Sequence, residues 1–204
     1  SAGNNLNAAI NNDYTLFAWG INTSGQVGDS TTQNKSSPVQ IGSNSWITSS
    51  AGSDQILAIN SVNQLFAWGL GTSGQLGDNS TISKSSPVQV SGSYNSVSAG
   101  LSFNAAIDST NKLFTFGLNN VGQLGDNTTI NKSTPTQIGS SSWSIVYSGG
   151  SYATAIDSAG KLYAWGLNTN YTLGDATSIT KSSPVQIAAG YSWTTISTGI
   201  DHTL

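Results

Sequence analysis

The chain has 204 residues, contains no Cys, Met, Glu or Arg, and carries a net charge of −3. Without Cys it has no disulfide framework and no thiolate metal site. Without Arg or a net positive charge it lacks the electrostatic footprint of a nucleic-acid-binding protein. Ser, Thr, Asn and Gly make up about half of the chain, which excludes a helical bundle. No apolar run approaches the roughly 20 residues of a membrane span.

The first predicted elements form a unit of four short strands. A run ending in Ala-Ile at Ile10 comes first, and LFAWG follows at 16–20. A turn rich in Gly and Asp then leads to SPVQI (37–41), and an aromatic-led stretch begins at Trp46 and ends in SAG (50–52). Apolar and polar residues alternate as in β-strands, and no run reaches the roughly 10–12 residues of a helix. We therefore expect an antiparallel four-stranded meander.

This unit occurs four times in one register. Its best-matched segment reads LFAWGINTSGQVGD, LFAWGLGTSGQLGD, LFTFGLNNVGQLGD and LYAWGLNTNYTLGD, at 16–29, 65–78, 113–126 and 162–175. We predict a single module, 1–204, with repeats at approximately 1–49, 50–97, 98–147 and 148–196, and with 197–204 starting a fifth.

One four-stranded sheet cannot bury both of its faces, so successive copies must stack to make a core. Four strands per unit at a period near 50 residues predict the blade of a β-propeller. The predicted fold class is all-β: a β-propeller of four-stranded antiparallel blades, about four of which are present as an arc of a larger ring.

The pattern WGxNxxGQLGD, followed by a Pro-Val strand and then SAG, resembles the regulator of chromosome condensation repeat. The likeness is greatest to the low-charge tandem repeats of bacteria and their viruses, and it covers essentially the whole chain. It implies a ring that usually has seven blades. The eukaryotic protein that names the family is a nucleotide-exchange factor for a small GTPase and binds chromatin. A bacterial relative inhibits β-lactamase by binding it.

One Asp and one Lys recur in every unit. The Asp residues follow Gly in a turn, where we expect their carboxylates to accept backbone N–H bonds; they are Asp29, Asp78, Asp126 and Asp175. A calcium site is disfavoured because neighbouring carboxylates lie a blade apart. The Lys residues would form a ring of positive charge that meets an anionic surface, or else solvated charges that protect edge strands; they are Lys35, Lys84, Lys132 and Lys181.

Two sets of aromatic residues recur as well. The set inside the LFAWG strand is expected to pack between blades: Trp19, Trp68, Phe116 and Trp165. The second set is flanked by Ser, Asn and Gly, and we expect it to be partly exposed and to supply candidate contacts with a partner: Trp46, Tyr94, Trp143 and Trp193.

Catalytic groups are scarce in the sequence. The one histidine, His202, matches Leu6, Gln55, Phe103 and Ala153 in the earlier copies, so we interpret it as a remnant of the repeat consensus. With no Cys, no Glu and no second His, neither a nucleophile–base pair nor a metal-activated water can be assembled from the usual groups. We expect no catalytic residue, no cofactor and no metal.

We therefore expect a non-enzymatic structural or recognition module of a surface-exposed assembly, such as a cell-surface or secreted filament or a virus fibre. The expected location is extracellular, on the cell surface or on a virion. The alternative is a discrete propeller that binds a protein or a glycan, and guanine-nucleotide exchange is a remote third. The expected partners are other protein subunits or further blades of the same polypeptide, with glycan as an open alternative. Neither nucleic acid binding nor membrane insertion is expected.

Overall fold

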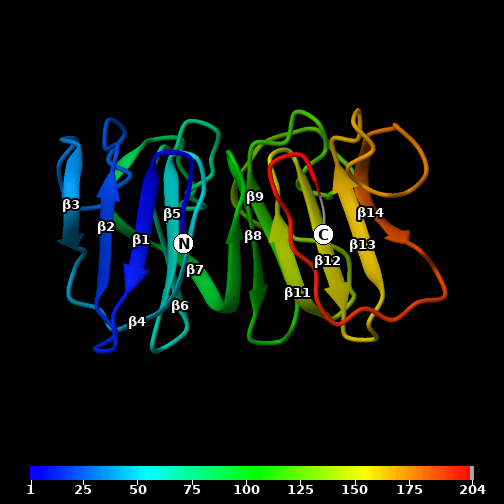
Figure 1. Ribbon diagram of the computed structural model, residues 1–204, viewed down its shortest axis with the longest axis horizontal. Coiled ribbons are helices and arrows are strands. Elements are labelled where there is room, and N and C mark those ends of the chain that lie inside the picture. The colour runs from blue at the N-terminus through cyan, green and yellow to red at the C-terminus, as the bar shows by residue number, and fades with distance from the viewer. Residues whose placement is uncertain (203–204) are drawn as a thin grey trace.

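The computed structural model describes residues 1–202, which form fourteen β-strands and no helix. The strands make four blades, numbered here 1 to 4 along the chain, which stand side by side (Figure 1). Blade 1 contains β1 (Leu6–Ile10), β2 (Leu16–Gly20) and β3 (Lys35–Gln40); blade 2 contains β4 (Trp46–Ala51), β5 (Gln55–Asn60), β6 (Gln64–Gly69) and the first half of β7 (Lys84–Ala99). Blade 3 contains the second half of β7, β8 (Phe103–Asp108), β9 (Leu113–Gly117) and β10 (Lys132–Gln137); blade 4 contains β11 (Trp143–Ser148), β12 (Tyr152–Asp157), β13 (Leu162–Gly166) and β14 (Lys181–Ile187). The predicted all-β partial propeller is confirmed.

Strands within a blade pair antiparallel in chain order, as the meander predicts. In blade 2, for example, β5 pairs with β6 from Gln55 opposite Gly69 to Ile59 opposite Leu65. Blade 1 has three strands, and a short bridge between Ala2 and Asn7 takes the place of its first strand. Because β7 runs unbroken from blade 2 into blade 3, these two blades form one seven-stranded sheet.

The first strands of successive blades lie next to one another, so the blades fan out from this line. Serine side chains join these strands across the blade boundaries. Ala99 N–H donates to Ser50 Oγ at 2.9 Å, and Ser148 N–H donates to Ser98 Oγ at 2.8 Å. Hydroxyl groups therefore satisfy backbone donors where two inner strands meet.

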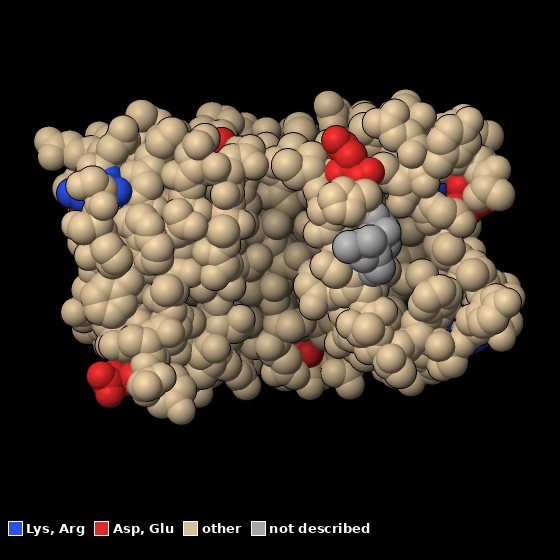
Figure 2. Space-filling view, in the orientation of Figure 1, with Lys and Arg blue, Asp and Glu red and all other residues tan. Residues whose placement is uncertain are grey.

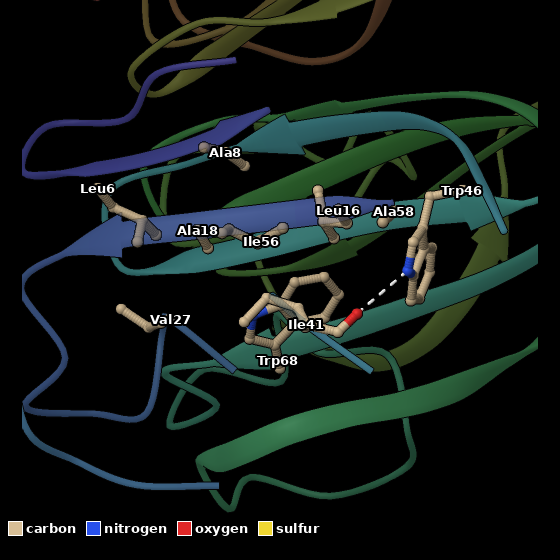
Figure 3. Packing of buried hydrophobic residues seen from close by; sticks show 11 residues of the cluster. Leu6, Ala8, Leu16, Ala18, Val27, Ile41, Trp46, Ile56, Ala58 and Trp68 are labelled. Atoms are coloured by element: carbon tan, nitrogen blue, oxygen red, sulfur yellow. Dashed lines mark hydrogen bonds between the residues drawn. The ribbon is translucent and has the colours of Figure 1, made fainter. Parts of the chain in front are cut away.

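The hydrophobic core lies between blades rather than inside them. The cluster between blades 1 and 2 combines Leu16 and Ile41 of blade 1 with Trp46 and Trp68 of blade 2 (Figure 3). The same combination of aliphatic residues from one blade and aromatic rings from the next recurs between blades 2 and 3 and between blades 3 and 4. Packing between blades thus supplies the apolar burial that one sheet cannot provide.

Three of the four members are buried in each of the two aromatic sets, which differs in part from the prediction. Trp68, Phe116 and Trp165 are buried, as predicted, but Trp19 is partly exposed on the outward face of blade 1. In the second set the predicted partial exposure is wrong for three members: Trp46 is 0% exposed, and Tyr94 and Trp143 are each 3% exposed.

The second set is buried because residues of the same blade and of the preceding blade cover it. The Trp46 ring lies edge-on to Phe66, with centroids 5.4 Å apart, and its Nε1 donates to Ile41 O at 3.3 Å. Tyr94 packs in the same way on Phe114. A ring held like this offers no face to a ligand, so Trp193, which is only partly buried, is the one member left with a surface.

The surface is mostly uncharged and polar. In the face shown in Figure 2, charged side chains form small separate groups among neutral residues. None of the described residues forms a helix that is long and apolar enough to cross a membrane.

Candidate functional site

The long connection before the last strand of each blade carries the repeated Asp, and the repeated Lys is the first residue of the strand that follows. These four connections lie along the upper edge of the molecule in Figure 1. In blades 1 to 3 the connection contains two glycines that adopt positive φ, for example Gly25 (80°) and Gly28 (90°) in blade 1, which lets the chain turn back tightly. Blade 4 has Tyr171 in place of the first of these glycines. We refer to this edge, residues 21–34, 70–83, 118–131 and 167–180, as the long-loop edge.

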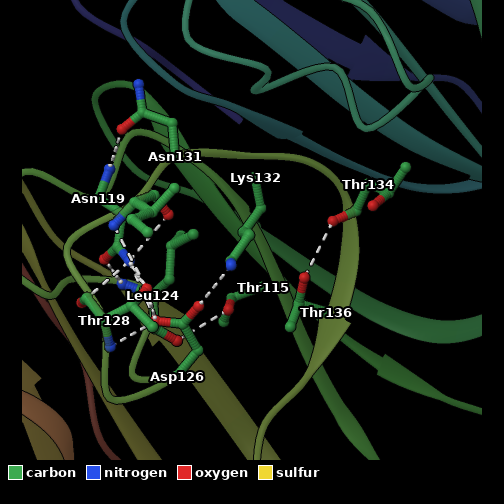
Figure 4. A network of polar contacts seen from close by, with 10 residues as sticks. Thr115, Asn119, Leu124, Asp126, Thr128, Asn131, Lys132, Thr134 and Thr136 are labelled. Carbon is green, nitrogen blue, oxygen red and sulfur yellow. Dashed lines mark hydrogen bonds and ion pairs between the residues drawn. The ribbon is translucent and has the colours of Figure 1, made fainter.

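A buried Asn holds each of three of these connections together. In blade 3, Asn119 Nδ2 donates to Asp126 Oδ1 and to the carbonyl oxygens of Thr128 and Ile130, at 3.1–3.2 Å (Figure 4). Its Oδ1 accepts a hydrogen bond from Leu124 N–H at 3.0 Å. Asn22 and Asn168 make equivalent bonds in blades 1 and 4.

Blade 2 has Gly71 where the other blades have this Asn. In blade 2 the backbone of the connection occupies the place of the Asn side chain: a Cβ built on Gly71 would lie 2.5 Å from Ile82 O. The repeat pattern WGxNxxGQLGD contains this Asn, but we did not predict its role in holding the connection. Its spacing of seven residues before the repeated Asp, at 22, 119 and 168, is the signal that could have found this role.

The repeated Asp residues have the turn role that the sequence predicts. Asp126 Oδ1 accepts the N–H of Thr128 at 3.0 Å and its hydroxyl at 2.7 Å. Asp29, Asp78 and Asp175 accept the same pair of bonds in their own turns. Each carboxylate therefore closes a local turn.

The repeated Lys residues are paired with these carboxylates. The distances from Nζ to Oδ2 are 2.7 Å for Lys35–Asp29, 3.6 Å for Lys84–Asp78, 3.3 Å for Lys132–Asp126 and 3.4 Å for Lys181–Asp175. The expected ring of positive charge is thus neutralised locally in every blade. A contact role for these Lys residues stays a prediction.

The Asp pKa values are lowered by the groups around them. Burial raises the pKa of Asp29, but the bond from Lys35, together with those from Thr31 and Asn22, outweighs burial and lowers the pKa to about 2. The pKa of Asp126 and that of Asp175 are lowered too, because hydrogen bonds from the neighbouring Thr, Lys and Asn outweigh the effect of burial. These three carboxyl groups therefore lose their protons more readily in the folded protein than in the unfolded chain.

Stability should consequently depend on pH below about 4. A carboxyl group with a lowered pKa contributes stability above its unfolded pKa of about 3.9, and this contribution is lost as the pH falls through the folded value. We expect the thermal midpoint at pH 2.5 to lie roughly 5 °C or more below that at pH 6. Calorimetry at the two pH values measures the difference. Asp29→Asn should lower the midpoint at pH 6 and narrow this difference, and equal midpoints of the wild-type protein would contradict the assignment.

A second candidate region lies where the first strands of blades 2 to 4 end. A shallow cavity of about 310 Å³ is lined there by residues from all four blades and from the segment after blade 4, among them Gly3, Gly52, Gly100, Gly149 and Gly199. A Cβ on each of the first four would lie within 3 Å of the carbonyl oxygen of the next glycine in the series, so only Gly allows this approach. The lining residues carry no ionisable side chain.

These glycines also correct the position that we matched to His202. Gly199 N–H donates to His202 O just as Gly149 N–H donates to Tyr152 O, so Tyr152 and not Ala153 is the blade-4 counterpart. The partner lies three residues after the glycine in every copy, so no additional residue lies between Gly149 and Tyr152. His202 is exposed. Within residues 1–202 no three His or Asp side chains are grouped so that they could hold a metal ion.

Comparison with known proteins gives one family. The model of the regulator of chromosome condensation (RCC1) repeat matches residues 15–59, 63–107, 111–156 and 159–204, and a second model of the same description matches residues 94–123. No curated protein sequence matches the chain.

Several solved structures share the fold. Human WBSCR16 superposes with a TM-score of 0.89 at 21% identity, over 99% of this chain and 55% of that one. Prp20p from Saccharomyces cerevisiae, described with its binding to Gsp1p and histones, gives 0.80 at 20% identity, over 92% and 49%. The ectodomain of the Arabidopsis thaliana receptor kinase ACR4 gives 0.55 at 16%, over 98% and 56%. The chain thus spans about half the length of these structures, and at these identities the likeness concerns the fold alone.

Proposed function

Because the chain belongs to the regulator of chromosome condensation (RCC1) repeat family, we propose that it is a non-enzymatic, protein-binding module of a larger surface-exposed assembly. The observation that carries the proposal is a row of exposed isoleucines on the long-loop edge. Ile82, Ile130 and Ile179 occupy equivalent positions in blades 2, 3 and 4 and are 65%, 65% and 63% exposed. Large apolar side chains that recur at one edge of a polar surface favour contact with another protein.

The other groups of this edge support binding rather than catalysis. Its carboxylates close turns and pair with Lys, and its buried Asn side chains bond to the backbone. These groups are used to hold the connections in place. The binding to Gsp1p and histones described for Prp20p belongs to that protein.

The proposed location is outside the cell, on a cell surface, in a secreted filament or on a virion. Support comes from the absence of the oxidisable residues Cys and Met and from the low charged fraction of 7%. Glycan is a weaker candidate ligand than protein, because a sugar ring stacks on an exposed aromatic face and three of the four aromatic residues that we expected to contact a partner are buried.

Association in the native source tests the proposal. We expect negative-stain electron microscopy of the protein from its natural source to show it within a larger assembly. A variant with Ile82→Gln, Ile130→Gln and Ile179→Gln should lose this association at least tenfold, as expected for the loss of about 1.4 kcal/mol or more of binding free energy. Its fold should persist, since blade 1 has Gln33 at the equivalent position.

An unchanged association of the triple variant would contradict the role of this edge. Free monomers alone in the natural source would contradict the assembly.

A further inference from the structure

A groove lies between blades 3 and 4, beside their last strands β10 and β14. It has a volume of about 570 Å³, which is within the range of ligand pockets, and every lining residue lies between positions 125 and 184. Its lining reaches from Asn127, in the long connection before β10, to Ser141, in the connection after it. Because β10 has 6 residues, the groove follows the strand for about 20 Å.

The equivalent place between blades 2 and 3 is a smaller cavity of about 200 Å³, where Phe114 replaces Tyr163 in the lining. Three residues separate the last apolar residue of blade 2 from the first aromatic residue of blade 3, whereas four residues, 139–142, do so beside the groove. The hydroxyl of Tyr94 also donates to Ser91 O at 2.9 Å and so lies across the smaller cavity. The larger volume therefore goes with a longer connection and with a Trp, which has no hydroxyl, in place of this Tyr.

The connection beside the groove is held in place by side chains. Lys112 Nζ donates to Ser140 O at 2.6 Å, and Gln137 Nε2 donates to Gly139 O at 2.8 Å. Gly139 adopts a φ of 62°, which lets the chain turn directly after the strand. This wall of the groove is thus formed before a ligand arrives, which lowers the entropic cost of binding.

Part of the lining is apolar. Tyr163 is partly exposed, and its ring lies edge-on to that of Trp143, with centroids 5.2 Å apart. Because Trp143 is itself 3% exposed, it supports the ring of Tyr163 from the inside. Pro184 and Ile138 also line the groove. These residues give an apolar surface on which the C–H face of a ligand can pack.

The other side chains of the lining are mostly uncharged and polar. The two charged ones, Asp126 and Lys132, form an ion pair at 3.3 Å (Figure 4). Hydroxyl and amide groups can both donate and accept hydrogen bonds, so the groove offers both kinds of partner but no counter-charge for an ionic ligand. The residues that carry these groups are Asn127, Thr128, Thr136, Gln137, Ser141 and Ser183.

We propose that this groove binds a segment of a neutral saccharide chain. The hydroxyl groups of a sugar donate and accept hydrogen bonds, as the lining groups do, and its C–H face matches the surface of Tyr163 and Pro184. The length of the groove favours a chain over a single sugar. The site needs no exposed face of Trp143. This inference goes beyond the proposed protein-binding function and uses none of the isoleucines of the long-loop edge.

Titration with short neutral saccharides tests the site. With the 204-residue chain labelled at its Ile and Thr methyl groups, we expect at least one of maltotriose, cellotriose and triacetylchitotriose to shift the methyl resonances of Ile138 and Thr136 in a saturable way. The dissociation constant should be about 1 mM, as for a short neutral ligand. The methyl groups of Ile56, which is buried between blades 1 and 2, are the internal control and should not shift. Glucose should bind at least tenfold more weakly, because it fills only part of the groove.

Matched variants locate the probe. Ser183→Trp should fill the groove and weaken binding at least tenfold, whereas Ser86→Trp, the same change at the equivalent position of blade 2, should leave the affinity unchanged. Gln137→Ala should weaken binding about threefold or more. Its control is Gln40→Ala, since Gln40 makes the same bond in blade 1, to Gly42 O at 3.3 Å. Equal thermal midpoints within each pair show that the fold persists.

Three results would overturn the proposal. The first is the absence of a saturable shift at Ile138 with all three trisaccharides up to about 20 mM, well above the expected dissociation constant. The second is an unchanged affinity of Ser183→Trp, and the third is a glucose affinity equal to that of the trisaccharides. The triple isoleucine variant should bind the trisaccharide as the wild-type protein does, so failure of this site and failure of the proposed function are distinguishable.

Discussion

Replacing Trp165 by Ala will lower the free energy of unfolding by about 3–5 kcal/mol, the usual cost of deleting a large buried ring. Trp165 is fully buried between blades 3 and 4. Its ring covers Gly125 and its Nε1 donates to Gln123 O at 3.0 Å. The deletion leaves a cavity between blades 3 and 4 and leaves the carbonyl oxygen of Gln123 without this bond. Urea denaturation measures the decrease in the free energy of unfolding.

The repeat provides the control for this change. Trp19 occupies the same position in blade 1 but is partly exposed on its outward face. Trp19→Ala should cost about 1 kcal/mol or less, since surface substitutions have small effects. If the two variants lost the same free energy of unfolding, packing between blades would contribute no more to stability than a surface contact does.

Replacing Asn119 by Ala will lower the free energy of unfolding by about 2–4 kcal/mol. The carboxamide bonds to the carboxylate of Asp126 and to two carbonyl oxygens, and it accepts the N–H of Leu124. Removing it leaves these groups without a partner, and a buried donor or acceptor that loses its partner costs about 1–3 kcal/mol. Thermal or urea unfolding measures the effect.

The neighbouring residue is a suitable control. Asn120 is exposed, and its Oδ1 accepts one bond from Gln123 Nε2 at 3.2 Å. We expect Asn120→Ala to cost roughly 0.5 kcal/mol or less, as for a surface change. A small effect of Asn119→Ala, comparable with that of its neighbour, would mean that water replaces the carboxamide.

The blades could be predicted because the turn residues and the apolar runs repeat together. Four copies of LFAWG and SPVQI at one spacing determine which residues share a strand, and the structure confirms them. Burial of Trp46 could not be predicted in this way. Its sequence neighbours are polar, but Ile41 and Phe66 cover it, and they come from the preceding blade and from a strand two places along the sheet.

The candidate site was predicted in part. The turn role of Asp126 follows from its place after Gly, and the structure confirms it. Its pair with Lys132 and the bond from Asn119 join residues six and seven positions away, on opposite sides of an irregular connection. A strand or helix has a fixed period that places such residues, whereas a long connection has none, so only the folded structure brings them together.

The continuous strand β7 has a consequence for how the molecule opens. The first half of β7 pairs with β6 of blade 2 and its second half with β8 of blade 3, so extended backbone, and not an irregular connection, joins these two blades. Blades 1 and 4 are joined to the rest through connections between separate strands. We therefore expect blades 2 and 3 to open together as one cooperative unit, a foldon, in hydrogen exchange.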